Sequence, residues 1–189
     1  ELIDLLDNIR KVNVDDNFKI SIPSDIEKIL YRIFKPKYKY IGIAPGAGEK
    51  EKIWPIDNFI NIAKYFENKF FKIVWFLGPD EESIKQLIKN NFSDSLYPEE
   101  LTNKFSSFEI VMATTKYLSC AIANDSGISH ILSTKHCPLI KLFGKKDPKK
   151  FITKNNQIIT ISANEFNSKD ISYINEKFVI DKISQLVSL

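Results

Sequence analysis

The sequence has 189 residues, a formal net charge of +3, and hydrophobic and aromatic contents of 43% and 12%. This length is ordinary for one α/β domain, with or without an extra arm, and such a chain buries about 70% of its unfolded surface. The composition excludes wholesale disorder and collagen-like proteins, and no apolar run approaches the roughly 20 residues that cross a bilayer. Lysines are dispersed and arginine is limited to Arg10 and Arg32, so we expect no nucleic-acid partner.

The cysteines indicate a reducing environment. Cys120 and Cys137 have neither the spacing of metal ligands nor the density of a disulfide scaffold. A zinc site would need both of them to converge with His130 and His136. We therefore expect a cytoplasmic protein without a metal or cofactor, with a peripheral position at the inner face of the membrane as an alternative. Because the first residue is Glu1, we also expect the sequence to be part of a longer or processed chain.

The first predicted elements precede a break at Lys35-Pro36-Lys37. Apolar residues at helical spacing predict a helix over residues 1–12, and alternation predicts a short strand over residues 18–22. A second helix is predicted over residues 24–34, with Ser24 and Glu27 forming its capping box.

From Tyr38 onward, short apolar runs alternate with amphipathic helices. The helices are predicted to begin near Pro55, Asp80, Ser106, Gly127 and Asn175. The predicted strands cover residues 40–44, 72–77, 120–123, 138–143 and 157–161, and a further short strand is expected near Leu96. Strands that are apolar on both faces and alternate with helices are typical of a Rossmann-like, doubly wound parallel sheet. Ligands of such sheets bind beyond the carboxyl ends of the strands.

Two loops at that edge are candidates for a phosphate site. The first, residues 44–55, contains Gly46, Ala47 and Gly48, whose small size lets the backbone approach a ligand, and Lys52 adds a charge before a helix start. It is neither a Walker loop nor a dinucleotide fingerprint, and an ordinary glycine-containing turn with solvated lysines is an equal alternative.

The second loop is Asn124-Asp125-Ser126-Gly127, followed by His130 one turn into a helix. The N–H groups of Ser126, Gly127 and Ile128 can point at an anion, and Asp125 can cap the helix or orient the loop. A lone histidine is more often solvated or packed than functional. Two such helix starts on one sheet edge nevertheless favour a diphosphate ligand.

These motifs together resemble glycosyltransferase family nine, whose best-known members are the lipopolysaccharide heptosyltransferases. The resemblance runs from about Tyr38 to the end, and the ordered set of motifs carries it: Pro45-Gly46-Ala47-Gly48, Lys52-Ile53-Trp54-Pro55, Phe76-Leu77-Gly78, Asn124-Asp125-Ser126-Gly127 with His130, Pro138, Leu142-Phe143-Gly144 and Asp147-Pro148. It departs from the family at Ser126, where threonine is commoner, and at Gly144-Lys145-Lys146, where Gly-Pro-Thr is usual.

The resemblance implies one half of a GT-B fold. Residues 37–189 would be the Rossmann-like domain that binds the nucleotide-sugar donor, and residues 1–36 the linker and tail of a missing amino-terminal domain. Matched by position, Lys52 would contact donor phosphate, and Asp125, Ser126 and Gly127, with His130 behind, would hold the diphosphate and sugar. Gly46, Ala47 and Gly48 would lie near the sugar phosphate. Met112 would approach the base, although a core methionine is the favoured interpretation.

The implied activity is inverting, metal-independent sugar transfer from a nucleoside diphosphate sugar such as ADP-heptose to lipopolysaccharide or another surface glycan. The family's catalytic base is expected in the amino-terminal domain, so this chain would have no catalytic residue and would be inactive alone. Two alternatives remain open: a non-catalytic nucleotide-binding module, and another GT-B enzyme that uses a UDP-sugar.

Overall fold

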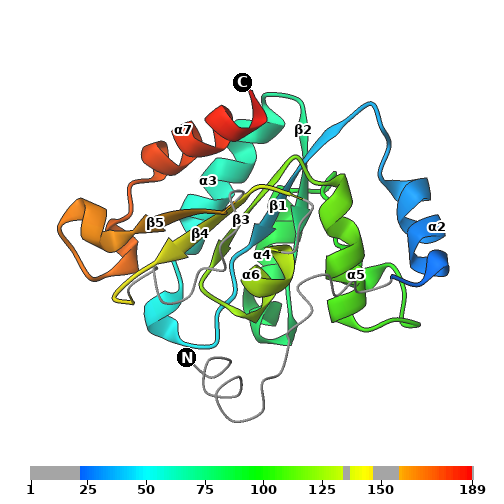
Figure 1. Cartoon of the computed structure of the whole chain (residues 1–189), viewed down its shortest axis with the longest axis horizontal. Coiled ribbons are helices and arrows are strands. Elements are labelled where there is room, and N and C mark those ends of the chain that lie inside the picture. Colours follow the sequence, from blue (N-terminus) through cyan, green and yellow to red (C-terminus); the bar gives the residue numbers. More distant parts are fainter. Residues whose placement is uncertain (1–21, 134–136, 147–157, 189) are drawn as a thin grey trace, which may run out of the picture.

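The computed structural model describes residues 22–133, 137–146 and 158–188. These residues contain a parallel sheet whose strands are ordered β2-β1-β3-β4-β5 (Figure 1). The strands are β1 Lys39–Ala44, β2 Phe71–Trp75, β3 Cys120–Asn124, β4 Leu139–Phe143 and β5 Ile158–Ser162. The predicted parallel α/β sheet is therefore confirmed. The predicted helix over residues 1–12 lies outside the described residues, as does the predicted strand over residues 18–22 apart from Ile22.

Both faces of the sheet are covered because alternate strand residues enter two separate apolar cores. In β1, Ile41 and Ile43 belong to one core, whereas Tyr40 and Ala44 belong to the other. This arrangement accounts for the nearly continuous apolar runs of the central strands, since β3 and β4 are buried throughout and β1 is buried after Lys39.

Helices α3 (Ile56–Glu67), α4 (Glu82–Asn91) and α7 (Glu176–Val187) contribute to the first core. The predicted stripe of α3 is buried at Phe59, Ile60, Ala63 and Phe66. Helix α7 lies beside α3 (Figure 1), where Asn61 donates a hydrogen bond of 2.8 Å to Glu176. Asn175 caps α7, as predicted, by accepting from the N–H of Phe178.

Helices α2 (Ser24–Ile33), α5 (Ser107–Thr114) and α6 (Gly127–Leu132) cover the opposite face. Helix α5 begins where predicted, and Ser106 caps it in a capping box with Glu109. The predicted capping box of α2 is wrong: Pro23 occupies the N-cap position, so Ser24 already lies inside the helix and makes no side-chain cap. Short 3₁₀ turns complete the described elements at Lys50–Lys52, Pro79–Glu81, Pro98–Glu100, Thr115–Tyr117, Ala163–Phe166 and Ile171–Tyr173.

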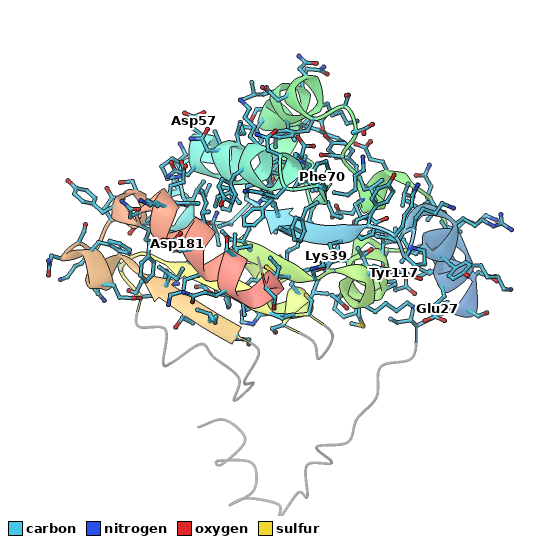
Figure 2. The ribbon with its side chains drawn as sticks, turned by 90° about the horizontal axis from the view of Figure 1, so that it is seen from above. Glu27, Lys39, Asp57, Phe70, Tyr117 and Asp181 are labelled. Carbon is cyan, nitrogen blue, oxygen red and sulfur yellow. The ribbon has the colours of Figure 1, made fainter. Side chains whose placement is uncertain are left out.

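Helix α2 is packed into the domain, although it lies in the range predicted to be linker and tail. Ile26, Leu30 and Phe34 are buried in the second core, and the ring of Phe34 stacks on Tyr117 with centroids 4.8 Å apart. Figure 2 shows Glu27 and Tyr117 close together at this end of the molecule, where Lys116 also pairs with Glu27. The boundary between residues 36 and 37 remains a prediction.

The strand expected near Leu96 is a single bridge. Leu96 exchanges backbone hydrogen bonds of 2.9 Å with Ile73 and Trp75 and thereby extends the sheet beside β2 for one residue. None of the helices in the described ranges is both long and apolar enough to span a membrane.

The strand order fixes where a ligand site can form. The chain runs from β1 to β2 on one side and then returns to place β3 on the other side of β1. In a doubly wound sheet, the loops after the two strands at this reversal diverge and leave a crevice. The loops after β1 and β3 are the two that the sequence singled out.

Candidate donor site at the carboxyl edge of the sheet

Asn124 joins the two loops. This buried residue ends β3. Its side-chain N–H₂ donates a hydrogen bond of 2.6 Å to the carbonyl oxygen of Pro45, and its Oδ1 accepts one of 3.3 Å from the N–H of Trp54. The loop after β1 is thus held at both ends by one side chain from β3.

The carboxylate of Glu81 approaches Gly46 closely. A Cβ at this position would lie 2.2 Å from Oε1 of Glu81, whose other oxygen accepts a hydrogen bond of 2.7 Å from the N–H of Gly78. A side chain at position 46 would therefore displace the carboxylate that stabilises the turn after β2. Around Gly48, by contrast, the space is open.

Lys52 lies at the end of the 3₁₀ turn Lys50–Lys52, and its side chain is only 20% exposed. Its Nζ lies 2.6 Å from Oε1 of Glu49, which also pairs with Lys146 at 3.4 Å. The hydrogen bond to Glu49 raises the pKa of Lys52, and the bond from Lys52 lowers the pKa of Glu49. Lys52 is therefore a cation at neutral pH, and it is held by a carboxylate that an anionic ligand can replace.

The start of the loop after β3 is held by hydrogen bonds between Ser126 and Ser129. The N–H of Ser126 donates a hydrogen bond of 3.2 Å to Oγ of Ser129, whose hydroxyl donates one of 2.6 Å to the carbonyl oxygen of Ser126. Ser126 also caps α6 by accepting from the N–H of Ser129. Of the three N–H groups expected to face an anion, that of Ser126 is thus already bonded within the loop. Gly127 is exposed and has open space where a Cβ would lie.

Asp125 forms a buried ion pair. Its Oδ1 lies 3.2 Å from Nζ of Lys141, and the two side chains are 8% and 2% exposed. Lys141 belongs to β4, and the other residues of this strand are apolar. Burial lowers the pKa of Lys141, and the negative charge of Asp125 opposes that shift.

A cavity of about 410 Å³ opens among the loops after β1, β3 and β4. Lys52 and Asp125 both line it, so the two predicted turns meet at one site. Three carboxylates and three ammonium groups face the cavity, together with an aromatic ring and a glycine. The lining residues are Glu49, Glu51, Lys52, Asp125, Phe143, Gly144, Lys145 and Lys146.

The other predicted residues lie around this cavity. Gly46 lines a neighbouring cavity of about 240 Å³ with Trp54 and Glu81. Ala47, Gly48, Ser126, Gly127 and His130 line neither of the two cavities. Met112 is buried on α5 and also lines neither.

His130 lies outside the cavity but within the electrostatic field of the ion pair. Partial burial and the positive charge of Lys141 lower its pKa, whereas Asp125 acts in the opposite direction. His130 is therefore mainly neutral at pH 7, and its imidazole can donate or accept a hydrogen bond.

The sequence did not identify Lys141 or the role of Asn124. One signal was available for Lys141, since a lysine in the middle of a strand with apolar neighbours is rarely buried without a partner. No comparable signal exists for Asn124, because its partners lie 70 and 79 residues away in the chain.

The strand order and the cavity at the reversal define a Rossmann-like, doubly wound domain with its ligand site at the carboxyl edge of the sheet. A family model described as glycosyltransferase family 9 (heptosyltransferase) matches residues 11–177. The chain belongs to glycosyltransferase family 9, and the predicted Rossmann-like fold, as one half of a GT-B fold, is confirmed.

Individual relatives are distant in sequence but similar in fold. Lipopolysaccharide core heptosyltransferase OpsX of Haemophilus influenzae is 20% identical over 155 residues, which are 82% of this chain and 44% of the relative. A family 9 glycosyltransferase from Veillonella parvula matches with a TM-score of 0.78 and 21% identity, over 98% of this chain and 58% of the other. E. coli heptosyltransferase WaaC, in a structure with ADP-2-deoxy-2-fluoro heptose, matches with a TM-score of 0.67 and 14% identity, over 96% and 53%. The chain thus spans about half the length of these relatives.

Proposed function

We propose that this chain is the donor-binding half of a glycosyltransferase that transfers a sugar from a nucleoside diphosphate sugar, of the ADP-heptose type, to a glycan acceptor such as lipopolysaccharide. The observation that carries the proposal is the shared cavity of Lys52 and Asp125 at the reversal of strand order. Family membership supports the reaction class, and the ADP-heptose analogue bound by WaaC supports the donor class.

The cavity has the charges that a diphosphate requires. Lys52, Lys145 and Lys146 line it, and a charge-assisted hydrogen bond to a phosphate oxygen contributes about 1.5–3 kcal/mol. Glu49 pairs with Lys52 and Lys146. A bound diphosphate would take its place as the partner of these lysines.

In the proposed reaction, an acceptor hydroxyl oxygen attacks the anomeric carbon of the donor sugar, and a base removes the hydroxyl proton. The bond between that carbon and the diphosphate oxygen breaks, and the nucleoside diphosphate leaves with the electron pair. Attack from the face opposite the leaving group inverts the configuration. The lysines stabilise the charge that develops on the leaving diphosphate, a role that metal ions play in other transferases.

We place the base and the acceptor site in a second domain, because the relatives are about twice as long as this chain. This proposal assigns Lys52 and the surrounding loops to the donor diphosphate, the Asp125 carboxylate to the hydroxyl groups of the donor sugar, and none of the described residues to proton removal. It accordingly expects the 189-residue chain to bind donor and to transfer no sugar.

Calorimetric titration of the 189-residue chain with ADP, UDP and GDP tests the donor assignment. We expect ADP to bind with the highest affinity and inorganic phosphate at the same concentration to bind much more weakly. Preferential binding of UDP would instead favour a UDP-sugar enzyme. Failure of all three diphosphates to bind would contradict the donor site itself, and sugar transfer by the chain alone would contradict the placement of the base.

A further inference from the structure

Lys141 is the most unusual ionisable residue in the described part of the sheet. It lies in β4, paired in register with Ala123 of β3 and Thr160 of β5, and its side chain is 2% exposed. Burying an ammonium group costs several kcal/mol unless a partner compensates for it. Stability alone does not call for a lysine here, since an apolar residue would suit a buried strand at lower cost.

The surroundings of Lys141 connect it to the candidate donor site. Its Nζ lies 3.2 Å from Oδ1 of Asp125 and 5.3 Å from the ring centre of Phe143, and both of those residues line the larger cavity. Lys141 itself does not line that cavity, so it stands behind Asp125 with respect to a ligand. Among the described residues, Lys141 is the ion-pair partner of the Asp125 carboxylate.

The charges around the cavity indicate how the pair of Lys141 and Asp125 affects the binding of a diphosphate. The residues that line it carry three negative and three positive charges, so the carboxylates oppose the attraction that the lysines exert on a diphosphate. Lys141 supplies one further positive charge directly behind the most buried of the three carboxylates. In a partly desolvated site, a carboxylate without this compensation would repel the ligand strongly.

We propose that Lys141 is a positioning residue of the donor site, which holds the Asp125 carboxylate in one orientation and offsets its negative charge so that a diphosphate can bind beside it. The inference rests on the proposed function, since it assumes that the cavity receives a nucleoside diphosphate. It assigns to Lys141 no direct contact with the ligand.

ADP titration of five forms of the 189-residue chain tests the inference: wild type, Lys141→Met, Lys141→Arg, Lys141→Met with Asp125→Asn, and Lys72→Met. The last is a matched control, because Lys72 also pairs with a carboxylate, Asp94 at 2.7 Å, but lies in the edge strand β2 and lines neither cavity. Adenosine, which has no phosphate, is titrated in parallel, and the melting temperature of each form is recorded.

We expect Lys141→Met to weaken ADP binding at least about tenfold, the order expected for one uncompensated charge near a phosphate. Affinity for adenosine should not change. Lys141→Arg should retain ADP affinity because it keeps the charge. The double variant should recover most of the loss, since the repelling carboxylate is then absent as well. Lys72→Met should bind like wild type.

The outcomes separate the inference from the proposed function. If wild type binds ADP and Lys141→Met binds it equally well, the inference is wrong and the donor site stands. If wild type binds no ADP, the donor site and the inference fail together. Should Lys141→Met not fold, the double variant decides, because replacing both members of a buried pair is commonly neutral or stabilising. A folded double variant with ADP affinity reduced tenfold or more would overturn the inference in favour of a direct contact by Lys141.

Discussion

The side chain of Asn124 and the backbone carbonyl of Pro45 are joined by a hydrogen bond of 2.6 Å that crosses from the end of β3 to the loop after β1. Because Asn124 also accepts from the N–H of Trp54, one buried amide sets the spacing of two of the loops that enclose the larger cavity. The position of Lys52 relative to Asp125 therefore depends on a residue that does not line that cavity.

Asn124→Ala should destabilise the fold. The substitution removes two buried hydrogen bonds and leaves the carbonyl of Pro45 and the N–H of Trp54 without partners, at an expected cost of about 2–4 kcal/mol in the free energy of unfolding. Urea denaturation measures this change. Asn90→Ala is the matched control, since Asn90 is exposed and its side chain accepts a hydrogen bond only from Gln86 among the described residues. Equal stabilities of the two variants would contradict the role given to Asn124.

Lys52→Ala should weaken ADP binding by about ten- to 150-fold, which corresponds to the loss of one charge-assisted hydrogen bond of about 1.5–3 kcal/mol. Calorimetry with the purified chain measures the dissociation constant. Lys50→Ala removes the same charge from the same 3₁₀ turn, but Lys50 is exposed and lines neither cavity, so it should have little effect. An unchanged dissociation constant for Lys52→Ala would remove this residue from the site.

Glu49→Gln should strengthen ADP binding. Glu49 pairs with Lys52 and Lys146, and this partly exposed pairing must be broken when a diphosphate binds. Since exposed pairs of this kind contribute little, we expect a two- to fivefold gain, roughly, in affinity. Glu51→Gln removes an equal charge from the same cavity wall, so comparing the two variants isolates the effect of the ion pair. A gain no larger than that of Glu51→Gln would show that Glu49 does not compete with the ligand.

Glu99 should make stability depend on pH. Burial raises the pKa of Glu99 to about 7, the hydrogen bond from the N–H of Leu77 opposes this shift, and the charge of Glu81 adds to it. Since the pKa is higher in the folded chain, folding favours the protonated acid. Its stabilising contribution is complete below the ordinary pKa of about 4.3 and is lost as pH rises through about 7.

Glu99→Gln isolates this effect because the amide oxygen can still accept from Leu77. The variant should match wild type in stability near pH 4.5 and exceed it by up to about 3 kcal/mol at pH 8. Urea denaturation across this range measures the difference, with Glu82→Gln as a control for the loss of a surface carboxylate. A difference that does not grow with pH would contradict the burial of Glu99 as an acid.

Most of the fold could be predicted because its signals are local. The short apolar runs and helical stripes placed the strands and helices within a few residues, and the alternation of the two predicted a parallel sheet. The predicted cap at Ser24 was wrong because the local pattern allowed the helix to start at either of two positions. Pro23, with its extended backbone, occupies the N-cap position. The choice depended on where the chain enters the helix, which the pattern does not encode.

The candidate site was predictable only in part. The sequence placed Lys52 and Asp125 at the carboxyl ends of two strands, and the structure brings them to one cavity. The sequence did not reveal that Glu49 pairs with Lys52, that the N–H of Ser126 is bonded within its own loop, or that Lys141 lies behind Asp125. Each of these depends on the direction of a side chain or on strand neighbours, and spacing along the chain does not give either.

The sequence by itself determined the class of fold, the edge of the sheet at which a ligand can bind, and the family to which the chain belongs. These follow from hydrophobic periodicity and short motifs, which act over a few residues. Only the tertiary structure decided which side chains share the cavity and how their charges are balanced. Ion pairs and buried hydrogen bonds join residues of different strands, and their energies depend on distances of a few ångströms that arise only when the sheet has formed.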